Sequence, residues 1–238
     1  MATRTLPLFP LSEVVLFPGM VLPLHIFEPR YIAMVEHCLA GDQRFGVALI
    51  RSGPEVGGLA EPCAVGTTAV IRDSSRIEER FVLLTHGEER FQILRSWSEG
   101  EVLMAEVEAY PDDPQSLANT EALAAEVRGR AAEHLRLIGE ALGKTFVPPQ
   151  LPDSPVELSF LLASGLQGEP ARRQELLELT DTAERLRRLR KLLGQQVATL
   201  SHRLEIHEEA ERVVGGNGHL DHKHLTSDIL NHLGEPEG

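Results

Sequence analysis

Cysteine, lysine and aromatic residues are all scarce in this chain of 238 residues. The two cysteines, Cys38 and Cys63, are too few for a disulfide framework, and we interpret both as reduced, inert apolar side chains. Lysine occurs only at positions 144, 191 and 223, and none of these stands in a recognisable serine–lysine arrangement. The net charge of −13 repels phosphate backbones unless basic residues are segregated. These shortages exclude a disulfide-stapled scaffold and argue against a nucleic-acid-binding protein.

Long apolar runs are missing as well. The longest, Val14 to Leu24, is too short to cross a bilayer, and Pro18-Gly19 would interrupt a helix within it. The N-terminus does not have the layout of a signal peptide. A composition of 42% apolar and 25% charged residues is ordinary for a globular protein. We therefore expect a soluble cytoplasmic protein that does not enter a membrane.

Two short motifs suggest chemistry, but neither fits its pattern. "GEALGKT" at 139–145 has one residue too few between Gly139 and Gly143 for a phosphate-binding loop, and it follows a helical stripe rather than a strand. "HEEAE" at 207–211 begins like a zinc-protease helix, but Glu211 replaces the second histidine. No G-x-S-x-G elbow occurs, and we interpret His219, His222 and His224 as at most an adventitious metal ligand set. We predict no catalytic residues, no cofactor and no metal site.

One part of the sequence is rich in arginine. A nucleic-acid surface needs basic residues on one face together with aromatic side chains that stack on bases. No aromatic residue follows Phe160, and acidic residues are interleaved with the arginines, so the pattern predicts a solvated helix face with ion pairs rather than a nucleic-acid site. The basic residues are Arg172, Arg173, Arg185, Arg187, Arg188, Arg190 and Lys191.

Residues 1–113 are predicted to form a β domain. Short β-prone runs recur at intervals of roughly ten residues, separated by turn signals, which is typical of an antiparallel barrel or sandwich. One helix interrupts them, because Tyr31, Met34, Val35 and Cys38 share a helical face. The β-prone runs are "FGVALI" at 45–50, "VGTTAVI" at 65–71, "RFVLL" at 80–84, "RFQIL" at 90–94 and "VLMAEVEAY" at 102–110.

Residues 114–213 are predicted to form a helical bundle. A first apolar stripe ends at Gly143, and Ser154-Pro155-Val156-Glu157 has the pattern of a helix start. A third, long helix is expected from near Pro170 to about Val213. Residues 214–238 are rich in glycine, histidine and acidic residues, which favours a disordered tail.

The long last helix also suggests an assembly surface. Beyond Leu193 the apolar stripe continues, and the sequence contains no further helix to cover it. We therefore predict a homodimer or another partner contact through this stripe, the alternative being that the first two helices cover it. The predicted contact residues are Leu193, Val197, Leu200 and Leu204.

The first thirty residues combine strong apolarity with frequent proline. In order, "PLFPL", "VLFPG" and "PLHIFEPRY" resemble the opening of the Lon N-terminal domain, the substrate-recognition region of ATP-dependent Lon proteases. "FGVALI", "VGTTAVI", "HGEERFQI", "SPVELSFLLASGL" and "RRQELLELTDTAERLRRLRKLL" resemble successive later blocks of that domain. The resemblance covers roughly Leu6 to Leu193.

The resemblance implies an α+β fold: a PUA-like β pseudo-barrel of about six strands with one short helix, followed by a helical bundle. Pro18-Gly19 would then form a turn, with glycine at the position that takes a positive φ in type II. Glu28 and Arg30 would form an ion pair or cap the backbone. The motif residues, which we interpret as mainly structural, are Pro10, Phe17, Pro18, Gly19, Pro23, Phe27, Glu28, Pro29, Arg30, Tyr31, Gly66, Arg90 and Phe91.

Family members with full-length chains continue into an ATPase and a protease domain, for which the sequence up to Gly238 has neither a Walker motif nor room. The resemblance therefore implies a stand-alone, non-catalytic, proteolysis-associated module that binds exposed apolar segments or partner proteins. Its groove is expected near the junction of barrel and bundle or at loops such as Gly53 to Pro62. Two alternatives remain open: an RNA-binding PUA-like module and an unrecognised small-molecule enzyme.

Overall fold

The computed structural model describes residues 3–53, 60–118, 120–143 and 150–214. They form two compact units, Met1–Pro114 with Ala163–Thr180 and Gln115–Leu162 with Asp181–Gly238. These units are discontinuous in sequence, whereas the domains expected from the sequence, 1–113 and 114–213, are continuous. The difference is the segment 163–180, which groups with the β strands. The predicted tail from residue 215 onward lies outside the described residues.

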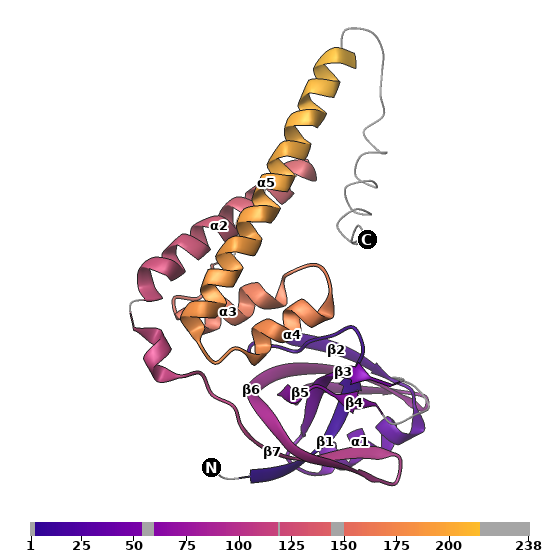
Figure 1. The fold of residues 1–238 in the computed structure, drawn as a ribbon. Helices are drawn as coiled ribbons and strands as arrows, with labels where there is room; N and C mark the ends of the chain where they lie inside the picture. The colour runs from indigo at the N-terminus through magenta and orange to yellow at the C-terminus, as the bar shows by residue number, and fades with distance from the viewer. Residues whose placement is uncertain (1–2, 54–59, 119, 144–149, 215–238) are drawn as a thin grey trace. The chain divides into compact units, whose positions relative to one another are not determined.

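The first unit is built on a mostly antiparallel sheet of seven strands (Figure 1). Neighbouring strands pair in the order β1, β7, β6, β5, β3. A parallel pairing of β1 with β3 joins the two ends of this series, so that the sheet closes on itself. Strand β2 pairs with β6, and the two-residue β4 pairs with β3. The strands are β1 (Thr3–Leu11), β2 (Val21–Ile26), β3 (Arg44–Ser52), β4 (Glu61–Pro62), β5 (Val65–Ile77), β6 (Arg80–Glu99) and β7 (Val102–Ala109). The α+β fold predicted from the sequence is confirmed, with one strand more than the expected six or so.

Pro18, one of the prolines near the N-terminus, stands at the second position of a turn, which does not need a backbone donor. In the Pro18-Gly19 turn, the Met20 N–H donates to the Phe17 carbonyl at 3.0 Å and Gly19 has a φ of 81°. A positive φ at the third position of such a turn is the type II geometry that the sequence predicts. Phe17 itself is fully buried. The chain therefore reverses sharply between β1 and β2 while an aromatic side chain anchors the connection.

Helix α1 (Pro29–Ala40) carries the apolar face that its spacing predicts: Tyr31, Met34, Val35 and Cys38 are all buried. Pro29 occupies the first turn, where a helix has no use for a backbone donor. The buried face joins the core that Phe45, Leu83 and other residues of the sheet form. The helix is thereby held against the strands.

Cys38 is expected to be chemically silent in the folded protein. Its thiol is buried and donates to the Arg44 carbonyl at 3.3 Å, and burial, aided by Asp42, raises the pKa of the Cys38 thiol to about 11. Only the thiolate reacts with iodoacetamide, so at pH 8 Cys38 should remain unmodified until the protein unfolds. Peptide mapping after timed alkylation, with and without denaturant, checks this. Rapid labelling of Cys38 in the native protein would contradict it.

The second unit is helical. Helix α2 (Thr120–Ala141) packs against α5 (Thr182–Val214), and most of α3 (Pro155–Ser164) belongs to the same unit. Two predicted helix boundaries are confirmed: Gly143 follows α2 with a φ of 61°, and the Ser154 hydroxyl accepts from the Glu157 N–H at 3.4 Å. A positive φ is typical of a glycine that follows the end of a helix.

The prediction of one helix from Pro170 to about Val213 is wrong. The structure has α4 (Pro170–Glu178), an extended residue at Leu179, and then α5. The Asp181 carboxylate accepts from the Glu184 N–H at 2.9 Å and thereby caps the start of α5. The D-x-x-E spacing of Asp181 and Glu184 was the sequence signal for this second start.

A buried arginine lies at the first turn of α5. Arg185 is completely buried, with its guanidinium 4.0 Å from the centre of the Phe160 ring and its Nε donating to the Ser159 hydroxyl at 2.8 Å. It also donates to the Thr182 hydroxyl at 3.2 Å. Arg185 therefore joins α3 to α5 and is not part of a solvated basic face.

Candidate functional site

The end of β1, the end of β2 and the start of α1 enclose a pocket of about 130 Å³, which we call the β1–β2 pocket. Its walls are mostly apolar and include much of the "HIFEPRY" motif. The lining residues are Phe9, Pro10, Leu11, Leu24, His25, Ile26, Phe27, Glu28 and Tyr31.

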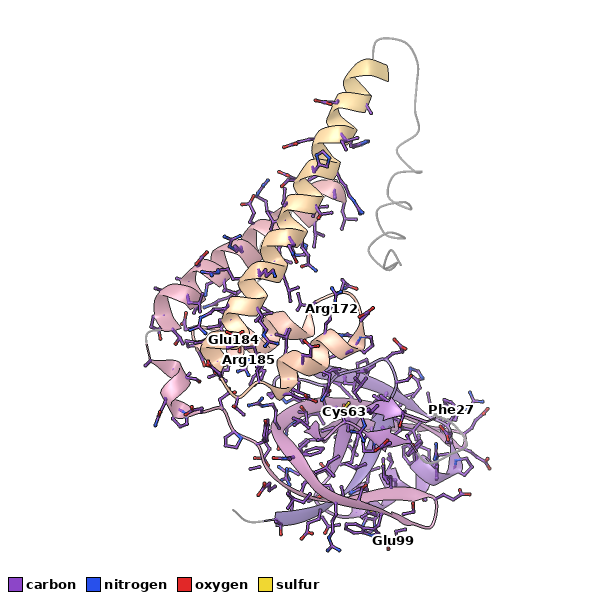
Figure 2. The ribbon with its side chains drawn as sticks, in the orientation of Figure 1. Phe27, Cys63, Glu99, Arg172, Glu184 and Arg185 are labelled. Atoms are coloured by element: carbon purple, nitrogen blue, oxygen red, sulfur yellow. The ribbon has the colours of Figure 1, made fainter. Side chains whose placement is uncertain are left out.

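The alternation of β2 determines which side chains reach the pocket's rim. Leu22, Leu24 and Ile26 are buried, while Val21 and the residues between are exposed. Phe27 follows the strand and is 59% exposed (labelled in Figure 2). An exposed phenylalanine beside a pocket is unusual, because burying such a side chain is worth about 1.5–3 kcal/mol.

A rigid set of contacts supports this exposed residue. Arg30 pairs with the Glu28 carboxylate at 3.0 Å, one of the two roles that the resemblance implied for these residues, and both side chains are mostly buried. The Arg30 guanidinium lies 4.4 Å from the centre of the Tyr31 ring, and that ring meets Phe9 edge-on at 4.5 Å. The Glu28 carbonyl accepts from the Tyr31 N–H at 3.0 Å. These contacts hold the backbone that follows Phe27 in place, and the pairing of Ile26 with Phe81 holds the residue before it.

Exposed apolar side chains recur along two paired strands beside the pocket, with the exposed His25 between Pro23 and Phe27. Val21 on β2 is 54% exposed, and Leu84 on β6 is 44% exposed. Pro23 is exposed and lies directly opposite Leu84 in the register. We call Val21, Pro23, Phe27 and Leu84 the β2–β6 apolar face.

The chemistry of the pocket favours binding over catalysis. Small-molecule sites usually measure about 300–1,000 Å³, so a pocket of about 130 Å³ has room for one apolar side chain rather than a substrate. No serine, cysteine or lysine is among its lining residues, and the carboxylate of Glu28 is already paired with Arg30. Among the described residues, no group of three or more His, Cys, Asp or Glu side chains is arranged to hold a metal ion.

The remaining motif residues lie away from the pocket and stabilise the first unit. Gly66 and Phe91 form one such contact: a Cβ on Gly66 would lie 2.5 Å from the Val47 carbonyl oxygen and 2.6 Å from the Phe91 ring. Phe91 is fully buried, and a Cβ on Gly46 would lie 2.8 Å from the same ring. The two glycines make room for the ring.

Arg90 is the other structural motif residue. Its side chain is 2% exposed, donates to the carbonyls of Leu177 and Leu179, the latter at 2.7 Å, and pairs with the Asp112 carboxylate at 2.7 Å. It therefore ties β6 to the segment after β7 and to the end of α4, whose carbonyls carry the negative end of the helix dipole. Sequence reasoning missed these partners because they lie 87 and 89 positions away.

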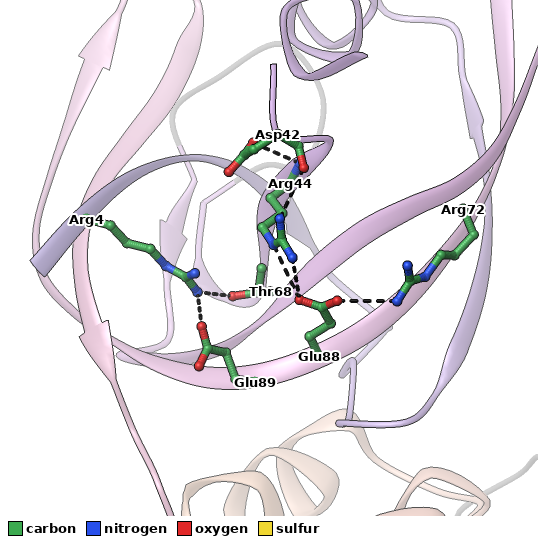
Figure 3. Close-up of polar contacts among 7 residues, drawn as sticks. All are labelled: Arg4, Asp42, Arg44, Thr68, Arg72, Glu88 and Glu89. Atoms are coloured by element: carbon green, nitrogen blue, oxygen red, sulfur yellow. Dashed lines mark hydrogen bonds and ion pairs between the residues drawn. The ribbon is translucent and has the colours of Figure 1, made fainter. Parts of the chain in front are cut away.

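Charged side chains on the barrel surface neutralise one another. Arg4 pairs with Glu89 at 2.7 Å (Figure 3). Glu88 pairs with two arginines, Arg44 at 3.2 Å and Arg72 at 3.3 Å. Arg4 also donates to the buried Thr68 hydroxyl. This cluster is therefore an ion-pair network and not a basic patch for phosphates.

Arginines of the arginine-rich stretch in α5 are likewise paired with carboxylates. Arg187 and Arg188 both pair with Glu184 at 3.1 Å, and Arg190 pairs with Glu126 of α2 at 3.1 Å. These contacts lower the pKa of the Glu184 carboxyl, mainly through the hydrogen bond from Arg188, and that of Glu126, mainly through the bond from Arg190. The arrangement agrees with the predicted ion-paired helix face.

The proposed assembly stripe on α5 is partly covered. Leu193 and Leu200 are buried and Val197 and Leu204 are half-buried, because α2 packs along α5. The expectation that no helix covers this stripe beyond Leu193 is therefore wrong. The homodimer stays a prediction, and among the α5 side chains that the structure describes, Ile206 is a large apolar one that is exposed, at 53%.

No helix in the described part of the chain has the length and apolarity needed to cross a membrane. Part of the loop from Gly53 to Pro62, one of the two expected places for a groove, lies outside the described residues.

Comparisons with known proteins agree with this fold. A family model for the ATP-dependent protease La (LON) substrate-binding domain matches residues 5–195. The Lon protease of Methylocella silvestris is 27% identical over 201 residues, covering 84% of this chain and 25% of that protein. Lon protease 2 of Myxococcus xanthus is 28% identical over 207 residues, covering 85% of this chain and 25% of that protein. The chain thus spans about a quarter of the length of the curated relatives it matches.

Two solved structures are also similar. The Lon N-terminal domain protein from Xanthomonas campestris is 28% identical with a TM-score of 0.56, covering 78% of this chain and 96% of that one. The N-terminal domain of the Mycobacterium avium complex Lon protease is 22% identical with a TM-score of 0.61. The match covers 80% of this chain and 98% of that one, and the two agree in fold. The resemblance drawn from the sequence blocks is confirmed.

Proposed function

The chain belongs to the LON substrate-binding domain family, and from this we infer that it is a non-catalytic module that binds exposed apolar segments of other proteins. The observation that carries the proposal is the β2–β6 apolar face, which borders a pocket with room for one side chain. Folded proteins rarely leave large apolar side chains together on their surface unless a partner covers them. We place the binding site there, on the β1–β2 pocket and the face beside it.

The two alternatives have less support. An RNA-binding surface needs basic and stacking side chains together, and the arginines described above are buried or paired with carboxylates. A small-molecule enzyme needs a larger pocket than the β1–β2 pocket, whose one carboxylate, that of Glu28, is already paired with Arg30. Purified protein is therefore expected to bind unfolded protein in preference to generic RNA.

Replacing Phe27 with alanine is expected to weaken binding of an unfolded protein by at least tenfold. The probe is reduced, carboxymethylated α-lactalbumin, and its affinity is measured by fluorescence anisotropy. Phe27 stands at the rim of the pocket and offers the largest exposed apolar area there, as anchor residues at interfaces do. Leu84→Ala, in the centre of the face, should give a smaller loss in the same direction.

Leu94→Ala is the matched control. Leu94 is 47% exposed and lies on the same strand as Leu84, but ten residues further along, roughly 33 Å at the rise of an extended strand. The control should bind as the unaltered protein does. Equal losses for Phe27→Ala and Leu94→Ala would contradict the placement of the site, and absence of binding by the unaltered protein would contradict the proposed function.

A further inference from the structure

Strand β2 has one edge that pairs with no other strand in the described part of the chain. It pairs with β6, and the Gly87 N–H donates to the Met20 carbonyl at 2.9 Å just before the strand begins. Because hydrogen-bonded pairs alternate along an antiparallel ladder, this contact fixes which residues face β6. Leu22, Leu24 and Ile26 direct their backbone groups toward β6, and the intervening residues direct theirs away from it.

The outward-facing backbone groups belong to Val21, Pro23 and His25. Backbone donors and acceptors must be paired with protein or with water, and those on a strand edge form a template for another strand. Pro23 has no N–H, but its backbone faces away from β6, so no hydrogen bond between β2 and β6 is lost. The edge therefore offers donors at Val21 and His25 and acceptors at all three residues.

The edge leads into the β1–β2 pocket. Leu24, His25 and Ile26 belong both to β2 and to the pocket wall. A segment lying along this edge would direct alternate side chains to opposite sides of the sheet. One set would meet the β2–β6 apolar face, and the other would point toward the pocket.

We propose that an extended segment of a non-native protein adds to the outer edge of β2 as a further strand and places one apolar side chain in the β1–β2 pocket. This rests on the proposed function and specifies the class of segment. Because both of its faces meet apolar surface, the preferred segment is a continuous apolar, β-prone run. Such runs form strands buried on both faces in native proteins and become accessible only on unfolding.

Pro23→Ala separates backbone pairing from side-chain contact by the sign of its effect. The substitution gives the edge another N–H, so an added strand gains a hydrogen bond and carboxymethylated α-lactalbumin should bind about three- to tenfold more tightly. If the apolar face acted through side chains alone, the same substitution would remove contact area and weaken binding. Weaker binding by Pro23→Ala would therefore overturn the proposal.

His25→Pro and His25→Ala form the complementary pair. Both remove the imidazole, but only proline removes the outward N–H, as Pro23 already does two residues earlier on the same edge. His25→Pro should bind at least fivefold more weakly than His25→Ala. Equal affinities would count against pairing along this edge.

Amide hydrogen exchange of the unaltered protein tests the same point without any substitution. Addition of the probe should slow exchange at Val21 and His25, while Leu22, Leu24 and Ile26 are already protected by β6. If the probe binds and depends on Phe27 but leaves these two amides unprotected, strand addition is wrong and the proposed function stands. If the probe does not bind at all, the proposed function fails first.

Discussion

Replacing Arg90 with alanine is expected to destabilise the first unit by about 3–5 kcal/mol, because it removes one partner of a buried charged network. The guanidinium satisfies the carbonyls of Leu177 and Leu179 and the carboxylate of Asp112, and its carbon lies 5.2 Å from the centre of the Tyr110 ring. Without it, the mostly buried Asp112 loses this partner and the end of α4 loses its link to β6. Urea denaturation followed by the fluorescence of Trp97, the single tryptophan and a residue of β6, measures the change.

Arg95→Ala is the control for this prediction. Arg95 lies on the same strand and pairs with Glu106 at 2.6 Å, but its side chain is 70% exposed. An exposed pair of this kind contributes little to the free energy of unfolding. Arg90→Lys should lose an amount of stability between the losses of Arg90→Ala and Arg95→Ala, because an ammonium keeps the charge but not the planar group that reaches several acceptors. If Arg90→Ala and Arg95→Ala gave the same midpoint, the structural role of Arg90 would be refuted.

Replacing Gly66 with alanine is expected to cost about 1–3 kcal/mol through overpacking. The added methyl group would lie 2.5 Å from the Val47 carbonyl oxygen, and a backbone atom in a paired strand cannot move aside as a side chain can. The double variant Gly66→Ala, Phe91→Leu would relieve the contact with the ring but not the contact with that oxygen. It should therefore remain less stable than the unaltered protein in the same denaturation assay.

Gly129→Ala provides a control of opposite sign. Gly129 lies within α2, and a Cβ there would meet nothing within 4 Å. Removing glycine from a helix interior generally stabilises the helix by up to about 1 kcal/mol. Circular dichroism should show a raised melting temperature for this variant, and a melting temperature as low as that of Gly66→Ala would contradict the steric explanation.

The features that the sequence predicted correctly depend on residues close together in the chain. The turn at Pro18-Gly19, the buried face of α1 and the start of α3 at Ser154 each follow from a local pattern of a few residues. The features that it missed depend on distant contacts. The burial of Leu200 requires knowing that α2 packs along α5, and the pocket beside Phe27 requires the relative positions of β1 and β2, which no spacing within either strand specifies.

The misplaced helix boundary illustrates the same limit. The apolar period runs on from α4 into α5, so periodicity alone favours one helix through Leu179. The local cap at Asp181 and the distant bonds from Arg90 to the carbonyls of Leu177 and Leu179 favour a break. Where a periodic pattern and a cap signal disagree, a partner from elsewhere in the fold decides which one prevails.

The discontinuity of the first unit has a consequence for synthesis on the ribosome. Arg90 emerges 87 residues before Leu177, an interval of roughly 4–17 s at translation rates of about 5–20 residues per second. From Ala109 onward all seven strands have been made, but the acceptors that α4 supplies to Arg90 do not yet exist. The nascent barrel therefore holds Arg90 without these two carbonyl partners until the chain beyond Leu179 has been made.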